Sequence, residues 1–391
     1  MACAAVALAI RPALEVADIV RDFGETFRRA YTVTPDQAKV LRAITACRTS
    51  ALGGHLDVCD RCEFSRPSYN SCRNRHCPKC QGSTQQAWID QRAKRILPVG
   101  HYHAVFTVPD VLHRLAAYRR EEVFAALFSA AAETLLELGV SRLGVDLGFT
   151  MVLHTWTRDL RFHPHVHAIV SAGGLSLDGT HWVSHPRFLL PVRVLGALFR
   201  GKMLAAIRAL HARGVFKLFD DFRDPQAFDC MMARLAKKRW VVYAKRPFGR
   251  PEHVIAYLGR YTHRVGISNH RLLARSGDHV TIATKDGQTS TMHGVDFLRR
   301  FVQHVLPKGF VKIRHYGMYA ASHVETKLAV ARSSLPAPSP PLADNDPVDG
   351  VDGVGVDEAF GKPPSAAAPR CPQCLVGSLI AVPLPLGLDS S

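Results

Sequence analysis

The sequence lacks the segments that would place the protein in a membrane or export it. None of its 391 residues belongs to an uninterrupted apolar run of the roughly 18 to 20 residues that a membrane-spanning helix needs. The apolar start, Ala2–Ile10, has no positive charge before it, and charged residues begin at Arg11 without a cleavage pattern. We therefore expect a cytoplasmic protein with no membrane partner.

Acidic residues are scarce relative to basic ones. The chain has 33 Asp and Glu against 50 Lys and Arg, which gives a formal net charge of +17. This balance favours a polyanionic partner, nucleic acid above all, over an acidic small molecule. The C-terminal part is the exception, because from Ala331 onward three basic residues stand against seven acidic ones and Pro, Ala, Gly, Asp and Ser dominate. We predict that residues 331–391 form a disordered tail that carries one CxxC motif.

The apolar pattern of the remaining chain predicts an α+β protein of several domains. Residues 1–46 are expected to be helical, with Thr34 and Pro35 typical of an N-cap and first turn. Residues 47–94 lose the apolar periodicity and contain most of the cysteines, so we predict a zinc-binding domain there. Residues 95–330 alternate strands and helices, as a largely antiparallel sheet flanked by helices would. The predicted strands cover residues 102–109, 148–156, 162–170 and 239–245, and the predicted helices cover residues 112–139, 192–213, 225–238 and 251–264.

Two CxxC motifs define the predicted zinc site. Cys59 and Cys62 form one pair, Cys77 and Cys80 form the other, and fourteen residues lie between the pairs. This spacing suits a tetrahedral four-thiolate zinc site formed by two facing knuckles. Buried free thiols are the alternative, but the flanking residues are charged and polar rather than apolar.

Four further side chains near these motifs could complete a second zinc site: Cys47, His55, Cys72 and His76. The sequence leaves open whether one or two zinc ions bind, since a lone histidine is more often a hydrogen-bonding residue than a ligand. Arg73, Arg75 and Lys79 lie in the same segment, so the zinc-held loop is predicted to contact phosphates, with a merely solvated loop as the alternative. The CxxC of the tail, Cys371 and Cys374, supplies only two ligands and needs a partner from elsewhere.

A second constellation lies in the predicted strand "RFHPHVHAIV". His163, His165 and His167 have two-residue spacing, so an extended strand projects all three from one face. The ring nitrogens of a row of imidazoles on a buried strand have few possible hydrogen-bond partners unless that face meets a metal or a polar cleft. Partly exposed strand histidines are the alternative.

A third pattern lies in "VIAYLGRYTHRVGISNHRL". Tyr257 and Tyr261 are four residues apart, which in a helix places both phenols on one face. Such pairs are usually packing residues, but this pair is surrounded by cations suited to phosphate oxygens: Arg260, His263, Arg264 and Arg271.

The segments "SCRNRHCPKCQ", "FHPHVH" and "YLGRYTHRVGISNHRL", in this order, resemble the insertion sequence 91 family of transposases over roughly residues 15–320. The family belongs to the HUH endonucleases, which are named for two histidines flanking a hydrophobic residue. His165, Val166 and His167 match that triplet, and Tyr257 and Tyr261 match the tyrosine pair of the two-tyrosine branch.

The resemblance implies a transposase that nicks and rejoins single-stranded DNA at element ends by a rolling-circle route. The tyrosines would form a 5′-phosphotyrosine, which keeps the bond energy, so no nucleotide cofactor is expected. His165 and His167 would hold Mg²⁺ or Mn²⁺ against the scissile phosphate, with His154 and Gln303 as candidates for a third ligand. Contacts to DNA phosphates are expected from four arginines: Arg73, Arg75, Arg260 and Arg264.

The implied fold is the HUH α+β sandwich, similar to the RNA-recognition motif, with the histidine strand central and the tyrosine helix over its polar face. Two other functions compete with this one. A zinc-dependent DNA-binding regulator would use no catalysis, and a hydrolytic nuclease would use the histidines with water instead of tyrosine. The sequence leaves open the target DNA, self-association and which tyrosine attacks first.

Overall fold

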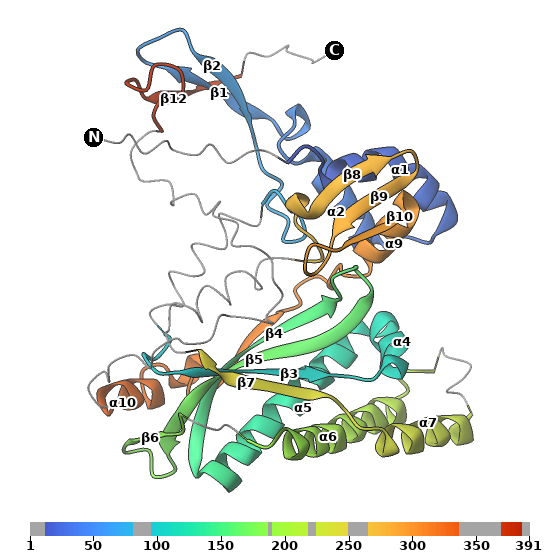
Figure 1. Cartoon of the computed structure of the whole chain (residues 1–391), viewed down its shortest axis with the longest axis vertical. Coiled ribbons are helices and arrows are strands. Elements are labelled where there is room, and N and C mark those ends of the chain that lie inside the picture. Colours follow the sequence, from blue (N-terminus) through green and yellow to red (C-terminus); the bar gives the residue numbers. More distant parts are fainter. Residues whose placement is uncertain are drawn as a thin grey trace.

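The computed structural model describes residues 12–80, 95–186, 190–217, 224–248, 265–335 and 369–384, and these form three regions along the long axis of the molecule (Figure 1). A large sheet with its helices forms one end. A helical region that contains both N-terminal helices lies in the middle, and a small sheet that carries cysteines forms the other end. The prediction of an α+β fold is confirmed.

The large sheet has six strands, and five of them follow the order β11-β4-β5-β3-β7, while β6 pairs with β5. All pairings are antiparallel, and β5 is central, as the sequence predicted. The strands are β3 (His101–Thr107), β4 (Val145–Trp156), β5 (Phe162–Ser176), β6 (Trp182–Ser184), β7 (Val242–Phe248) and β11 (Ile313–Gly317).

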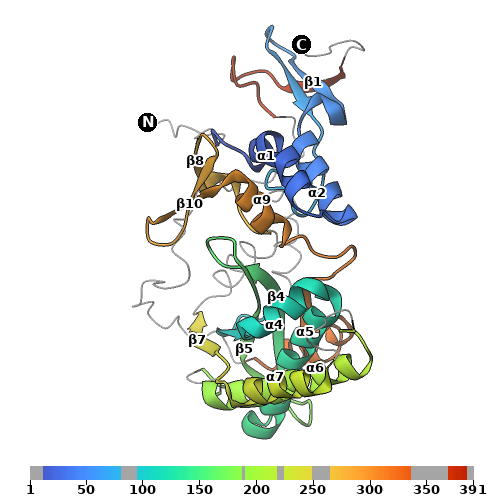
Figure 2. The same cartoon turned by 90° about the vertical axis from the view of Figure 1, so that its right-hand side faces the viewer.

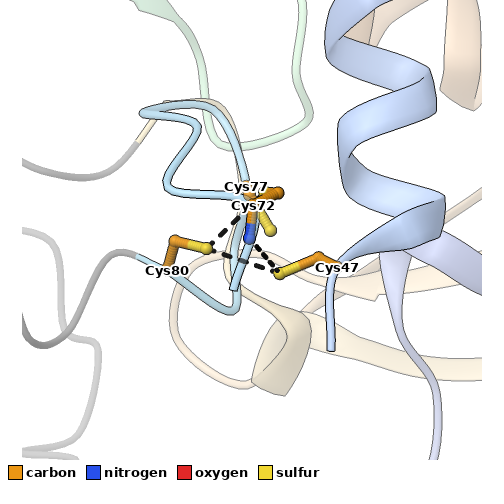
Figure 3. Close-up of side chains that lie close together, drawn as sticks. All are labelled: Cys47, Cys72, Cys77 and Cys80. Atoms are coloured by element: carbon orange, nitrogen blue, oxygen red, sulfur yellow. Dashed lines mark hydrogen bonds between the residues drawn. The ribbon is translucent and has the colours of Figure 1, made fainter. Parts of the chain in front are cut away.

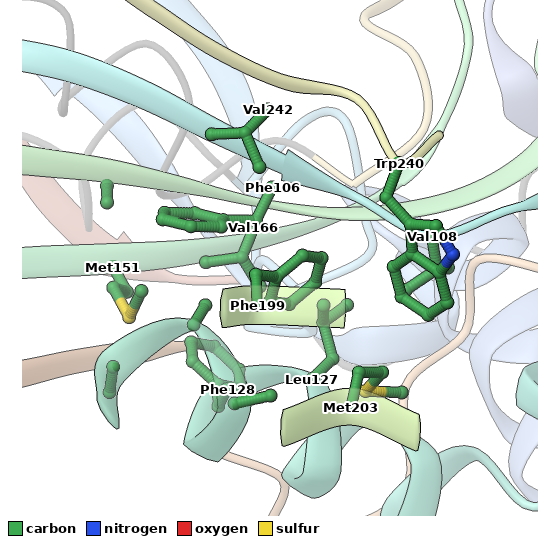
Figure 4. Packing of buried hydrophobic residues seen from close by; sticks show 14 of the residues in the cluster. Phe106, Val108, Leu127, Phe128, Met151, Val166, Phe199, Met203, Trp240 and Val242 are labelled. Carbon is green, nitrogen blue, oxygen red and sulfur yellow. The ribbon is translucent and has the colours of Figure 1, made fainter. Parts of the chain in front are cut away.

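Four helices cover one face of this sheet (Figure 2): α4 (Asp110–Tyr118), α5 (Arg120–Leu138), α6 (Val192–Ala212) and α7 (Pro225–Lys237). Their apolar side chains interlock with every second residue of the strands, so that Phe106 and Val166 meet Leu127 and Phe199 (Figure 4). Full burial of each such side chain contributes about 1.5–3 kcal/mol. Since Val166 faces this core, its neighbours His165 and His167 project from the opposite face.

The predicted helix 112–139 is in fact two helices. Arg119 separates α4 from α5 with φ −116° and ψ 65°, outside helical values, and its guanidinium donates a hydrogen bond to the carbonyl of Val215. With the π-helical turn Gly139–Leu143, the second helix is long and apolar enough to span a membrane. Most of it is buried against the sheet, which is typical of the core helix of a globular domain.

The middle region combines two helices near the start of the chain with a helix and a small sheet from residues 272–302. Helices α1 (Val16–Ala30) and α2 (Pro35–Ala46) share a core with α9 (Gly294–Val302) and with a three-stranded sheet of order β10-β9-β8. The predicted N-cap is confirmed, because the hydroxyl of Thr34 accepts from the Gln37 amide and Pro35 is the first residue of α2. The strands are β8 (Leu272–Ser276), β9 (His279–Ala283) and β10 (Thr289–His293), and short 3-10 turns cover Ser50–Leu52, Asn269–Arg271 and Ala321–His323.

The middle region is attached to the large sheet through the loop between β4 and β5. Leu160 at its tip is buried in the core of the middle region. His304, just after α9, hydrogen-bonds the carbonyl of Leu160 at 3.1 Å and the hydroxyl of Thr155 at 3.2 Å. The middle region therefore holds the strands that carry the histidines at the end where the β4–β5 loop joins them.

The cysteine-rich end differs from the predicted organisation. Strand β1 (Gly54–Cys59) pairs on one side with β2 (Ser65–Tyr69) and on the other with β12 (Leu379–Pro383). Residues 331–333 end helix α10 (Lys327–Ser333), which packs against β5 and β6 of the large sheet. The prediction of a disordered tail is thus wrong for residues 331–335 and 369–384, since a strand at the end of the chain completes a sheet begun near its start.

Candidate functional site

Three histidines meet on the polar face of the large sheet. His154 on β4 lies directly opposite His165 on β5, and His167 is two residues further along the same strand face. One ring nitrogen from each lies within 4.8 Å of the others. The structure thus brings the two HUH histidines together with His154, one of the two candidates for a third ligand. Gln303, the other candidate, is the C-cap of α9 in the middle region.

Each imidazole is held in position by its surroundings. The Nδ1–H of His165 donates to the carbonyl of His163 at 2.7 Å, which leaves Nε2 with its lone pair for a ligand. The indole of Trp156 stacks on the ring of His154, with centroids 4.8 Å apart. Burial lowers the pKa of His165 to about 4 and lowers that of His167 well below its ordinary value. These rings are therefore neutral at physiological pH, which is the form that binds metal ions.

His103 on β3 is a further member of this site that the sequence analysis missed. Its Nε2 lies 2.8 Å from Nδ1 of His167, and the two rings are stacked with a 6° interplanar angle. The signal was present, because His103 occupies an alternate position in the predicted strand 102–109. Only the pairing of β3 with β5 shows that it shares a face with the HUH histidines.

This donor set fits a divalent cation. Three imidazole nitrogens on paired strands can converge on one ion and leave other positions open to oxygen ligands. Mg²⁺ prefers oxygen donors, so of the two predicted cations the nitrogen set favours Mn²⁺. The tyrosines predicted to act beside it, Tyr257 and Tyr261, and the arginines Arg260 and Arg264 lie outside the described residues.

The cysteines combine differently from the sequence prediction. Cys77 and Cys80 lie with Cys47 and Cys72, not with Cys59 and Cys62 (Figure 3). The sulfur of Cys80 is 3.4 Å from that of Cys47 and 3.6 Å from that of Cys72. The cause is tertiary, because Cys47 ends α2 directly beside the loop that carries the other three. We call these four residues the helix-side cluster.

The two histidines proposed for a second zinc site are not ligands of either cluster in this arrangement. His55 hydrogen-bonds the carboxylate of Asp57 at 3.0 Å. His76 is buried; its Nδ1 lies 3.1 Å from the side chain of Asn74, and its Nε2 accepts from the Leu306 amide. Burial lowers the pKa of His76 to about 3, so its ring remains a neutral acceptor. His76 therefore holds the cysteine loop to the segment that follows α9.

Two of the three basic side chains of this loop form contacts within the molecule. The Arg75 guanidinium donates to the carbonyls of Phe310 and Pro307 at 2.6 and 2.7 Å. Lys79 forms a buried ion pair with Glu15 at 2.5 Å. Among the described residues, Arg73 is the one predicted phosphate contact of this loop that is exposed and makes no such intramolecular contact. Its backbone is left-handed, with φ 51°.

The CxxC of the C-terminal segment finds the partner that the sequence analysis required. Cys371 and Cys374 lie with Cys59 and Cys62, and the sulfur pairs Cys59–Cys374 and Cys62–Cys371 are each 3.7 Å apart. We call these four residues the hairpin cluster. Backbone amides of Gly377 and Val376 lower the pKa of Cys374 to about 6, which favours its thiolate.

Comparison with known proteins places this architecture in a family. A model described as "Putative transposase" matches residues 148–327, and one described as "Transposase zinc-binding domain" matches residues 19–108. The chain is 40% identical over 385 residues to "Putative transposase y4qJ" of Sinorhizobium fredii, which covers 94% of both proteins. The chain belongs to the insertion sequence 91 family of transposases.

A second relative of the transposase is "Transposase for insertion sequence element IS801" of Pseudomonas savastanoi pv. phaseolicola, with 28% identity over 326 residues, 78% of this chain and 77% of the relative. No solved structure matches the transposase. Together the two family models cover the whole histidine site, with His103 inside the zinc-binding match and the other three histidines inside the transposase match. They also cover the helix-side cluster, for which they support structural zinc. Cys371 and Cys374 lie outside both matched ranges.

Proposed function

We propose that the transposase nicks and rejoins single-stranded DNA at the ends of its mobile element through a 5′-phosphotyrosine, and that Tyr257 and Tyr261 are the nucleophiles. The observation that carries this proposal is the convergence of His154, His165 and His167 on one face of two neighbouring strands, β4 and β5. A regulator without catalysis has no need for one buried and two partly buried imidazoles whose nitrogens lie within 4.8 Å of one another.

In the nicking step, the phenol oxygen of one tyrosine forms a bond to the scissile phosphorus while the bond from phosphorus to the 3′ oxygen breaks. The phenol proton passes to solvent, and the departing 3′ oxygen takes up a proton and becomes a hydroxyl. Rejoining reverses this exchange with a 3′-hydroxyl as the attacking group, so the reaction consumes no nucleotide. Because the overall change replaces one phosphodiester with another, the energy of the cut bond is kept.

The histidine site serves this step through charge. A free tyrosine has a pKa of about 10 and is a weak nucleophile at neutral pH. A Mn²⁺ or Mg²⁺ ion bound by the three histidines would withdraw charge from a nonbridging phosphate oxygen and lower the barrier to attack. The residues of the chain keep the imidazoles neutral and oriented, and the basic surface of the protein attracts the DNA in the cytoplasm where it acts.

The test is transfer of a label from single-stranded oligonucleotides that carry the element ends. With Mn²⁺ present, an oligonucleotide labelled at its 3′ end should become covalently attached to the protein, whereas a 5′-labelled one should be released. The double variant Tyr257→Phe/Tyr261→Phe should lose the adduct but keep DNA binding, since only two hydroxyls are removed. Tyr118→Phe, an exposed tyrosine of α4, is the matched control and should retain the adduct.

Each other outcome contradicts part of the proposal. Cleavage that survives in the double Phe variant without an adduct indicates a hydrolytic nuclease. An adduct at the wild-type level in that variant places the nucleophile elsewhere. Attachment of the 5′-labelled oligonucleotide reverses the polarity of the link, and DNA binding without any cleavage indicates the regulator.

A further inference from the structure

The hairpin cluster joins parts of the chain that lie far apart in the sequence. Cys62 and Cys371 are separated by 309 positions, yet their sulfurs are 3.7 Å apart. Strand β12 follows the second CxxC and pairs with β1 from Cys59–Leu379 to His55–Pro383. Closing so large a loop has an entropic cost, so a stabilising interaction must hold the C-terminal segment in place.

Apolar burial does not supply that interaction. The buried members of this region are Cys59, Cys371 and Leu379, and the partly buried side chains packed on them are Cys62, Phe64 and Cys374. Four of these six residues are the cysteines themselves. Along β12 only Leu379 is buried, while Ile380 and Val382 are exposed. A sheet this small with so little core normally depends on a metal ion or a disulfide.

The sulfur geometry selects between these two. Disulfide sulfurs are about 2.05 Å apart, whereas the contacts here are 3.7 Å. Four thiolates around a zinc ion, with Zn–S bonds of about 2.3 Å, place neighbouring sulfurs about 3.8 Å apart in a regular tetrahedron. The observed separations therefore match a tetrahedral four-thiolate metal site.

The backbone around the four cysteines has the matching form. The amide of Arg61 donates to the sulfur of Cys59, and the amide of Gly377 donates to the sulfur of Cys374, at 3.3 and 3.2 Å. Both CxxC turns are closed in the same way, by bonds from the Cys59 amide to the carbonyl of Phe64 and from the Cys371 amide to that of Gly377. The two turns thus face each other as paired knuckles whose amides stabilise negative sulfur.

Gly377 shows how closely these knuckles approach. A Cβ atom at this position would lie 2.5 Å from the sulfur of Cys59 and 2.7 Å from the carboxylate of Asp60. The same Asp60 accepts a hydrogen bond from the Ser378 amide and donates its own amide to the Ser378 carbonyl. The C-terminal knuckle is therefore fitted to the N-terminal one through several independent contacts.

We propose that Cys59, Cys62, Cys371 and Cys374 bind a second structural zinc ion, which ties the C-terminal segment to the N-terminal zinc-binding module. Four soft thiolates in a tetrahedral arrangement select zinc over Mg²⁺ or Mn²⁺, so this ion is distinct from the one at the histidine site. The transposase accordingly holds two zinc ions per chain, one in each four-cysteine cluster.

The test maps which cysteines depend on one another in the full-length, zinc-loaded protein. Thiol alkylation followed by peptide mass spectrometry should find all eight cluster cysteines protected and the exposed Cys230 of α7 modified. In Cys371→Ser/Cys374→Ser, Cys59 and Cys62 should become reactive while the helix-side cluster stays protected. The zinc content found by metal analysis should fall from two ions per chain to one in this variant, whereas Cys230→Ser should still hold two.

The reciprocal variant separates this arrangement from the one that the CxxC spacing alone suggests. In Cys77→Ser/Cys80→Ser, we expect the alkylating reagent to modify Cys47 and Cys72 but not Cys59 and Cys62. This result supports the proposal even if the helix-side cluster unfolds. Exposure of Cys59 and Cys62 in this variant overturns it. So do a single zinc ion in the wild-type protein, iron in place of zinc, or a mass two hydrogens lower that reveals a Cys371–Cys374 disulfide.

Discussion

His167 has a neighbour that decides which of its nitrogens can bind a metal. When its Nδ1–H donates to Nε2 of His103, the Nε2 of His167 keeps its lone pair for the ion. His163 does the same for His165 through its backbone carbonyl, which no side-chain substitution can remove. His103 is therefore a positioning residue whose contribution can be measured separately from that of the ligands.

We expect His103→Ala to weaken Mn²⁺ binding by about 10- to 100-fold, because the ring of His167 loses the partner that orients it. His103→Gln, whose carbonyl can still accept a hydrogen bond, should recover part of this loss. Isothermal titration with Mn²⁺ gives the affinities, and the exposed His181→Ala serves as the control. An unchanged Mn²⁺ affinity in His103→Ala contradicts the role, and so does a loss that His103→Gln does not relieve at all.

At the scale of elements, the loop Cys72–Cys80 connects the helix-side cluster to the segment between α9 and β11. His76 and Arg75 bind the backbone of Leu306, Pro307 and Phe310, and that segment continues into the edge strand of the large sheet. A zinc ion in the cluster would hold this loop, and through His76 and Arg75 it would also hold the segment that leads from α9 to β11.

Two neighbouring arginines of this loop should behave in opposite ways. Arg75→Ala should lower the free energy of unfolding by about 1–2 kcal/mol, because charge-assisted hydrogen bonds to two carbonyls are lost from a partly exposed site. Arg73→Ala should leave stability unchanged but weaken single-stranded DNA binding and reduce its dependence on salt.

Urea denaturation and DNA titration over a range of salt concentrations measure the two effects. If Arg75→Ala weakens DNA binding more than Arg73→Ala at equal stability, the sequence-based expectation for Arg75 was right and its intramolecular role is secondary.

At the scale of the whole molecule, four described histidines are neutral in the folded chain, and two of them, His76 and His304, join separate regions. Burial lowers the pKa of His76 and His304 to about 3 and that of His101 and His165 to about 4. In the unfolded chain each of these groups titrates near its ordinary pKa of about 6.5. The unfolded state therefore binds more protons than the folded state between these values.

It follows that the free energy of unfolding should fall as the pH decreases from about 7.5 to about 5.5, by up to about 1.4 kcal/mol per pH unit for each histidine, mostly below the ordinary pKa. Urea midpoints measured with zinc in excess test this. His304→Gln should be less stable at the higher pH but show a shallower decline, whereas the exposed His181→Gln should keep the wild-type slope. A stability that stays flat over this range contradicts the prediction.

The sequence by itself determined the local features. The alternation of apolar residues with histidines set the two faces of β5, and Thr34 with Pro35 set the start of α2. The CxxC motifs predicted cysteine pairs that could hold a metal ion, and the ordered motifs identified the family. These features were readable because each depends on residues within a few positions of one another, where strand and helix periods and ligand spacing act directly.

Only the tertiary structure decided which ligands share a site. Every CxxC pair offers the same two thiolates, so the sequence could not show that Cys59 and Cys62 meet Cys371 and Cys374 while Cys77 and Cys80 meet Cys47 and Cys72. Nor could it show that His103 contacts His167, since their contact requires the register of β3 against β5. Such pairings depend on how sheets and loops close over long stretches of chain, and neither the residue types nor their spacing encodes that closure.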